Sequence, residues 1–167
     1  MSKNIKRLTL CAMLCVAALT IFIIEAYIPL PLPIPGLKLG LSNIITLFAL
    51  VYLSPREAFL ILISRILLGT MFSGNPSVLL YSLSGGIICL LCETLCFRVL
   101  GKKFICEISI IGAMVHNIVQ ILCAALITNT GAVFFYLPPL LVAAIITGAF
   151  CGLCVKYMMK HIKNGNE

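Results

Sequence analysis

Residues 59–72 have the sequence FLILISRILLGTMF, a largely apolar run whose only charged residue is Arg65. Arg56 and Glu57 precede this run and mark an end that faces water. At about 1.5 Å per helical residue, Arg65 lies roughly 12 Å inside a bilayer core about 30 Å thick. An unpaired charge at that depth costs several kcal/mol, so Arg65 is expected to have a partner or a ligand.

The composition indicates an integral membrane protein. The 167 residues are 62% hydrophobic and 10% charged, and the mean hydropathy is +1.17. A soluble core of this size cannot bury so much apolar surface. Six apolar spans are expected, at residues 8–28, 39–53, 58–73, 76–97, 104–128 and 139–155. The connections are brief, so residues 1–167 are predicted to form a single all-α domain, a bundle of six transmembrane helices.

The basic residues predict the orientation of this bundle. All except Lys38 and Arg65 precede the first span, follow the sixth, or lie between spans two and three or four and five. These positions share one side of the membrane, which the positive-inside rule makes cytoplasmic, so both termini are predicted to be cytoplasmic. Because the charge lies at helix ends, the net charge of +7 indicates contact with a lipid bilayer and no binding of nucleic acid. The first span lacks a clear small-x-small cleavage site and is expected to remain as a helix.

Two outer loops have unusual compositions. Residues 29–36 read PLPLPIPG, a pattern that favours a stiff polyproline II segment. Residues 131–137 read GAVFFYL, and Pro138 and Pro139 follow them, so a new helix is expected to begin there. The aromatic loop either covers a pocket or anchors the protein at the membrane interface.

Nine cysteines raise the question of a metal or redox site. Two pairs, Cys89 with Cys92 and Cys151 with Cys154, have C-x-x-C spacing. All nine lie within or at the edges of apolar spans, without flanking His or Asp. They are therefore interpreted as small packing residues, and no metal is expected.

Polar residues inside the spans predict a binding site. His116 and Gln120 are four residues apart on one helix face, with Asn117 beside them. Glu25, Thr46 and Ser82 belong to the same set of polar positions, although each polar residue alone could simply bond to a neighbouring helix. Together, at similar depth, they favour an outward polar cavity. The predicted substrate-binding residues are Lys38, Asn43, Arg65, Tyr81, Ser84, His116, Asn117 and Gln120.

The remaining acidic residues and several absent motifs limit the possible functions. Glu93 is expected near the cytoplasmic end, paired with Arg98 or a partner protein, and Glu107 at a solvated helix end. The sequence contains no G-x-x-x-x-G-K-[ST] motif for ATP and no Asp that could hold a magnesium diphosphate. We therefore expect no catalytic residues, no cofactor and no enzyme activity, but a protein that binds a solute without its own energy source.

Four segments of the chain resemble a known family. They are PGLKLGLSN at 35–43, SRILLG at 64–69, YSLSGG at 81–86 and GAMVHNIVQ at 112–120. In these segments the chain resembles the bacterial Gx transporter family, whose members are often labelled heptaprenyl diphosphate synthase component I. That family is similar to the substrate-binding S components of energy-coupling-factor (ECF) transporters. The resemblance covers nearly the whole chain and implies six helices in the bacterial plasma membrane with both ends inside.

The resemblance also implies a mechanism. An S component captures a vitamin-like solute from outside, then associates with a transmembrane coupling protein and a pair of cytoplasmic ATPases. Here the solute is expected to be anionic, an isoprenoid or quinone precursor being one class, since Lys38 and Arg65 suit phosphate or carboxylate. S components often dock through small residues on the first helix, and Cys11, Ala12, Cys15 and Ala18 supply such a surface without a strict Ala-x-x-x-Ala. The alternatives are a non-catalytic membrane accessory of heptaprenyl diphosphate or menaquinone biosynthesis, and a purely structural membrane protein.

Overall fold

The structure, a computed structural model, describes residues 3–27, 38–74 and 76–164. These residues form helices and no strands. The α-helices are α1 (Lys3–Ala26), α2 (Asn43–Tyr52), α3 (Pro55–Ser73), α4 (Pro76–Leu100), α5 (Ile105–Thr128) and α6 (Leu137–Asn164). Two short 3₁₀ helices, η1 (Lys102–Phe104) and η2 (Gly131–Tyr136), precede α5 and α6. The proline-rich segment 29–36 lies outside the described residues.

Each of the six predicted spans corresponds to one α-helix, which confirms the all-α prediction for the described residues. Helices α1, α4, α5 and α6 are long and apolar enough to cross a membrane. Helix α2 is apolar but only 10 residues long, and α3 carries Arg56, Glu57 and Arg65. The protein is therefore a membrane-associated helical bundle.

Helix α2 lies inside the bundle rather than on its surface. It packs against α1, α3, α4 and α6, and its residues 45–51 are all buried. A helix that is apolar all round, as α2 is, needs such an enclosed place. Ten residues give a helix about 15 Å long, roughly half the thickness of a bilayer core. The start of α2 thus lies at an intermediate depth, and the site described below lies at this end.

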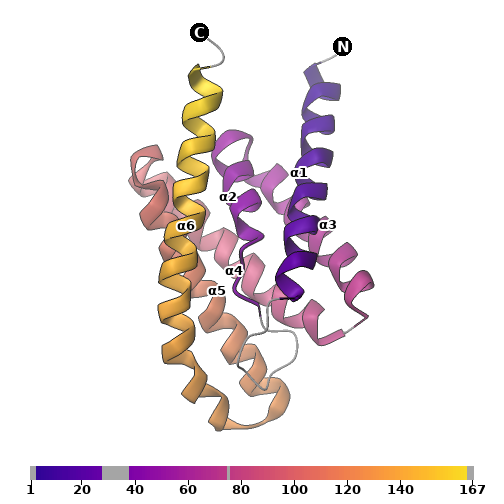
Figure 1. Cartoon of the computed structure of the whole chain (residues 1–167), viewed down its shortest axis with the longest axis vertical. Coiled ribbons are helices and arrows are strands. Elements are labelled where there is room, and N and C mark those ends of the chain that lie inside the picture. The colour runs from indigo at the N-terminus through magenta and orange to yellow at the C-terminus, as the bar shows by residue number, and fades with distance from the viewer. Residues whose placement is uncertain (1–2, 28–37, 75, 165–167) are drawn as a thin grey trace.

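The start of α1 and the end of α6 lie at the same end of the bundle (Figure 1). The connection between α5 and α6 lies at the opposite end (Figure 1). This arrangement agrees with an even number of passes. It also gathers the basic helix ends, among them those at Arg7, Arg56 and Arg98, at the end of the bundle that holds the termini.

The aromatic segment before α6 is partly packed into the bundle. In η2, Val133 is buried in a small apolar cluster with Tyr81, Ile121, Ala124 and Leu140. Phe135 is 84% exposed in the same segment. Since η2 lines none of the polar cavities below, its contacts favour the predicted interfacial anchor over a cover for a pocket.

Candidate functional site

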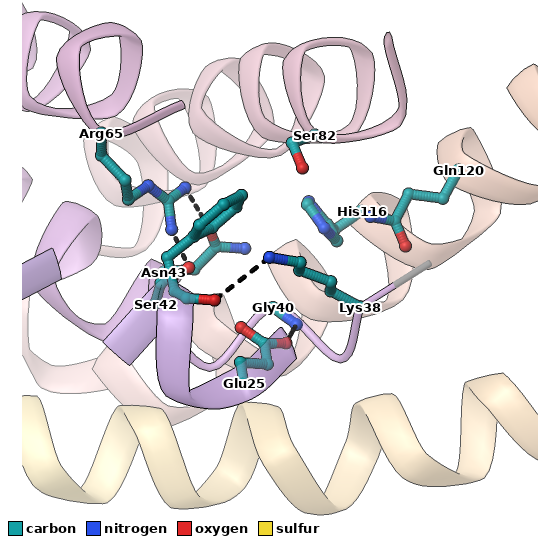
Figure 2. A pocket seen from close by; sticks show the side chains of 10 residues that line it. Glu25, Lys38, Gly40, Ser42, Asn43, Arg65, Ser82, His116 and Gln120 are labelled. Atoms are coloured by element: carbon teal, nitrogen blue, oxygen red, sulfur yellow. Dashed lines mark hydrogen bonds between the residues drawn. The ribbon is translucent and has the colours of Figure 1, made fainter. Parts of the chain in front are cut away.

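A small polar cavity lies where α2 begins, enclosed by five helices and by the segment leading into α2 (Figure 2). Because the helix starts inside the bundle, the positive end of its dipole faces this cavity. Broken or short helices place their ends in the same way at many membrane binding sites. The lining residues are Phe22, Glu25, Lys38, Gly40, Ser42, Asn43, Arg65, Ser82, His116 and Gln120.

Arg65 reaches the cavity from α3 and is only 2% exposed, which confirms the predicted burial. One terminal nitrogen, Nη1, donates to the hydroxyl of Ser42, and the other, Nη2, donates to Oδ1 of Asn43 at 3.0 Å. Among the described residues no carboxylate forms an ion pair with Arg65. The guanidinium therefore holds the first turn of α2 through neutral oxygens and keeps its charge uncompensated by direct contact.

Lys38 and Phe22 form the wall of the cavity on the α1 side. The ammonium of Lys38 donates to the backbone oxygen of Phe22 at 3.1 Å and lies 3.2 Å from the centre of its ring. This position combines a hydrogen bond with a cation–π contact. The ring itself packs against Gly69 of α3, where an added Cβ would come within 2.3 Å of the ring. Gly69 thus makes room for the ring that closes the cavity.

His116 and Gln120 enter the cavity from α5, and glycines give them space. A Cβ at Gly85 of α4 would lie 3.0 Å from His116 Nδ1 and 3.1 Å from Gln120 Cγ. A Cβ at Gly40 would lie 3.3 Å from Cδ2 of the same imidazole. Both side chains are nine-tenths or more buried. The YSLSGG segment therefore contributes the Ser82 hydroxyl to the site, and its Gly85 lets α5 side chains approach closely.

Glu25 is a cavity residue that the predicted site omitted. Its Oε1 accepts the backbone N–H of Gly40, whose φ of 83° turns the chain into α2. Glu25 lies near the C-terminal end of α1, beside the segment that leads into α2. Ser42, Ser82 and Phe22 also line the cavity outside the predicted set. The Gly40-Leu41-Ser42-Asn43 sequence, typical of a turn into a helix, was the available signal for Ser42.

Several buried polar atoms have no hydrogen-bond partner, and most of them belong to this cavity. Among the described residues there are seven such atoms, and five of them are Glu25 Oε2, Arg65 Nε, His116 Nδ1 and the Nε2 and Oε1 of Gln120. An unpartnered buried polar atom is unfavourable by about 1–3 kcal/mol. Donors and acceptors are both present, so the cavity can receive a group that both accepts and donates hydrogen bonds.

Three predicted site residues do not line this cavity. Tyr81 is buried in the apolar cluster around η2. The hydroxyl of Ser84 donates to the oxygen of Leu80 within α4. Asn117 donates from Nδ2 to the oxygen of Leu140 at 3.1 Å and so ties α5 to α6. The structure brings the other five predicted residues together: Lys38, Asn43, Arg65, His116 and Gln120.

The expectation that Glu93 lies near a helix end, paired with Arg98, is wrong. Glu93 is 3% exposed, and Arg98 is exposed at the far end of α4. The carboxylate packs against Gly112, where a Cβ would lie 2.4 Å from Oε1. It lines a second small chamber that shares Gly40 and Asn43 with the first. Gly112 leaves the space that allows this burial. Within the described residues, no three His, Cys, Asp or Glu side chains gather as metal ligands would.

The cavity is nearly filled in this conformation. Its free volume is about 10 Å³, roughly the least that holds a water molecule. A larger cavity of about 90 Å³ adjoins it and shares Phe22 and Lys38, with Ile23, Tyr27, Gly69, Phe72 and Ser73 as its other walls. Phe22 and Lys38 therefore separate a polar chamber from a mostly apolar one.

The comparison with protein families gives a clear result. The family model of heptaprenyl diphosphate synthase component I matches residues 14–158. This chain belongs to that family. The match begins in α1 and ends in α6, so the matched region includes every residue of the polar cavity. Neither the curated proteins nor the solved structures contain a match to this chain.

Proposed function

We propose that the protein is the substrate-binding component of an ECF-type transporter in the bacterial plasma membrane. Both termini would be cytoplasmic, and the protein would capture a small anionic solute, vitamin-like or an isoprenoid or quinone precursor, from outside. A separate coupling protein and a pair of cytoplasmic ATPases would drive uptake. The observation that carries this proposal is the convergence of five unpartnered buried polar atoms on one cavity. A protein whose only role is structural would not need to retain them.

The charge of the site supports an anionic group in the ligand. Arg65 and Lys38 reach the cavity without a direct ion pair among the described residues, while Glu25 already binds the backbone of Gly40. Two of the five guanidinium N–H groups hold α2, so three remain for a ligand. Gln120 and His116 would bind further polar groups of the same molecule.

Binding of a solute requires movement, because the polar chamber is too small in this conformation. Phe22 and Lys38 form the wall shared with the larger chamber. Rotation of the Phe22 ring, with Lys38 moving onto the ligand, would join the two spaces. The merged site would take an anionic group beside Arg65 and an apolar group beside Ile23 and Phe72.

A second candidate function is a non-catalytic membrane accessory in heptaprenyl diphosphate or menaquinone biosynthesis. The description of the matching family favours it. It requires no capture of a solute from outside, although a diphosphate group could still bind Arg65 and Lys38. The two candidates differ in their protein partners and not in the chemistry of the cavity.

Purification from native membranes in mild detergent distinguishes the candidates. We expect a tagged chain to co-purify with an ATPase pair and a membrane coupling protein, and native mass spectrometry to reveal a bound anionic molecule. The purified chain alone should neither hydrolyse ATP nor concentrate the recovered solute in liposomes. Co-purification with a prenyl diphosphate synthase subunit, without ATPases, would instead support the accessory function. Uptake by the chain alone on a proton or sodium gradient would contradict the transport proposal.

A further inference from the structure

A hollow of about 590 Å³ lies at the end of the bundle that holds the termini and shares no lining residue with the polar cavity. Its walls come from the start of α1, the start of α3 and the end of α4. The lining residues are Arg7, Ser54, Pro55, Arg56, Glu57 and Arg98. None of them belongs to the site proposed above.

The basic residues that line this hollow are all arginines. The sequence contains four arginines, and three of them line the hollow, while the fourth is the buried Arg65. Lysines predominate among the other basic residues, and no described lysine lines it. The planar guanidinium binds phosphate oxygens through paired hydrogen bonds, which an ammonium cannot do. A general excess of basic residues on one side of a membrane does not explain this choice of residue.

The charges of the hollow are unbalanced. Glu57 is its only carboxylate, and it binds Arg7 at 2.6 Å and the hydroxyl of Ser54. Among the residues that the structure describes, Arg56 and Arg98 have no carboxylate partner. Three guanidinium groups and one carboxylate leave two positive charges open to solvent. The start of α3, with Pro55 in its first turn, adds the positive end of a helix dipole.

Exposed apolar side chains follow each arginine along its helix. Leu8 follows Arg7 on α1, Leu60 lies one turn beyond Arg56 on α3, and Val99 follows Arg98 on α4. All three of these apolar residues are exposed, by 72%, 63% and 84%. In a membrane-associated bundle such side chains contact acyl chains. A molecule with a phosphate in the hollow and hydrocarbon along these helices would contact both surfaces at once.

We infer that the hollow binds the phosphate-bearing headgroup of an anionic phospholipid. Basic pockets between helices at the membrane surface are known to bind such headgroups. The Arg7–Glu57 pair links α1 to α3 at one side of the hollow. Arg56 and Arg98 supply the free charges that meet the phosphate. The inference does not depend on the solute in the polar cavity.

The test measures lipid retention by native mass spectrometry on the full chain, presented with phosphatidylglycerol or phosphatidylcholine. The double variant Arg56→Gln/Arg98→Gln leaves the Arg7–Glu57 pair intact. We expect it to lose at least about tenfold in affinity for phosphatidylglycerol and little for phosphatidylcholine. The control Lys102→Gln/Lys103→Gln removes the same charge at the same end of the bundle and should change affinity by less than about twofold.

Two further arms make the result decisive. Arg56→Lys/Arg98→Lys keeps the charge but not the paired geometry and should give an intermediate loss. Inorganic phosphate at millimolar concentration should not displace the lipid, because it lacks the apolar contacts. If Lys102→Gln/Lys103→Gln loses as much affinity for phosphatidylglycerol as Arg56→Gln/Arg98→Gln does, the inference is overturned in favour of a diffuse basic surface. Displacement of the lipid by inorganic phosphate would also overturn it and indicate a site for free phosphate. Circular dichroism and thermal melting check that every variant is folded.

Discussion

The polar cavity and the arginine hollow use the same cationic group in opposite surroundings. Arg65 is fully enclosed, and its two terminal nitrogens bind neutral oxygens of Ser42 and Asn43. Arg7 is about half exposed, with Glu57 as an ionic partner. Inside the bundle, hydrogen bonds fix the position of the Arg65 guanidinium, and its charge remains available to a ligand. At the surface, solvent and a carboxylate screen the charge. The buried site is suited to selectivity, and the surface site to attachment.

The largest expected effect concerns which side of the membrane each region faces. In a cysteine-free background, a single cysteine at Gly131 should react with an impermeant thiol reagent added outside intact cells. A cysteine at Lys102, on the same end as the arginine hollow, should not react. The difference should be all or none, since the bilayer excludes the reagent. Labelling at position 102 from outside would show that the predicted orientation is wrong and that the hollow faces outward.

Arg65→Lys should separate the two regions by function. Lysine cannot hold Ser42 and Asn43 and also present a paired donor to an anion, so affinity for the solute recovered from the native protein should fall about 10- to 100-fold. Arg98→Lys, in the hollow, should leave that affinity unchanged. Titration by native mass spectrometry, with a melting curve beside it, measures both. If Arg65→Lys lowers only thermal stability and not affinity, Arg65 is a structural clamp on α2.

Gly69→Ala tests how tightly the wall of the polar cavity is packed. The new methyl would overlap the Phe22 ring and push it toward Lys38, so the free energy of unfolding should fall by about 1–3 kcal/mol. Gly131→Ala is the matched control, because nothing lies within 4 Å of its added Cβ. It should change stability by less than about 0.5 kcal/mol. Equal melting temperatures for Gly69→Ala and Gly131→Ala would show that the Phe22 ring can move aside at little cost.

Glu57→Gln should have the smallest effect on stability. It removes the carboxylate of an ion pair whose arginine is about half exposed, and such a pair contributes about 1 kcal/mol or less, and less still at high salt. Urea unfolding at low and high salt measures this contribution. A loss of several kcal/mol that persists in salt would mean that the hollow is as rigid as the buried cavity.

Much of this architecture follows from the sequence, and the exceptions have one cause. The six helices, the buried Arg65 and its meeting with His116 and Gln120 follow from hydrophobic spans and the positions of polar residues within them. Depth counted from helix ends failed for Glu93, which is buried beside the start of α2. That count assumes full-length helices, whereas α2 is short and begins inside the bundle. The bond from Asn117 to Leu140 depends on how α6 packs, which one sequence does not reveal.

The sequence also did not predict that three arginines line one hollow. Arg7, Arg56 and Arg98 are far apart in the chain, and each alone fits an ordinary basic helix end. Only the packing of α1, α3 and α4 brings them to one hollow. The preference for arginine over lysine at these positions was the visible signal.

The central claim is that the unpartnered polar groups of the cavity serve a ligand and not the fold. Thermal unfolding of Gln120→Met without added ligand tests it most directly, with Ile121→Met of the same helix as control. Gln120 is fully buried with both amide atoms unpartnered, so its replacement should stabilise the protein by about 1 kcal/mol and raise Tm by about 2–4 °C. Ile121→Met should lower Tm slightly. A fall in Tm for Gln120→Met as large as that for Ile121→Met would contradict the account and make Gln120 a structural residue.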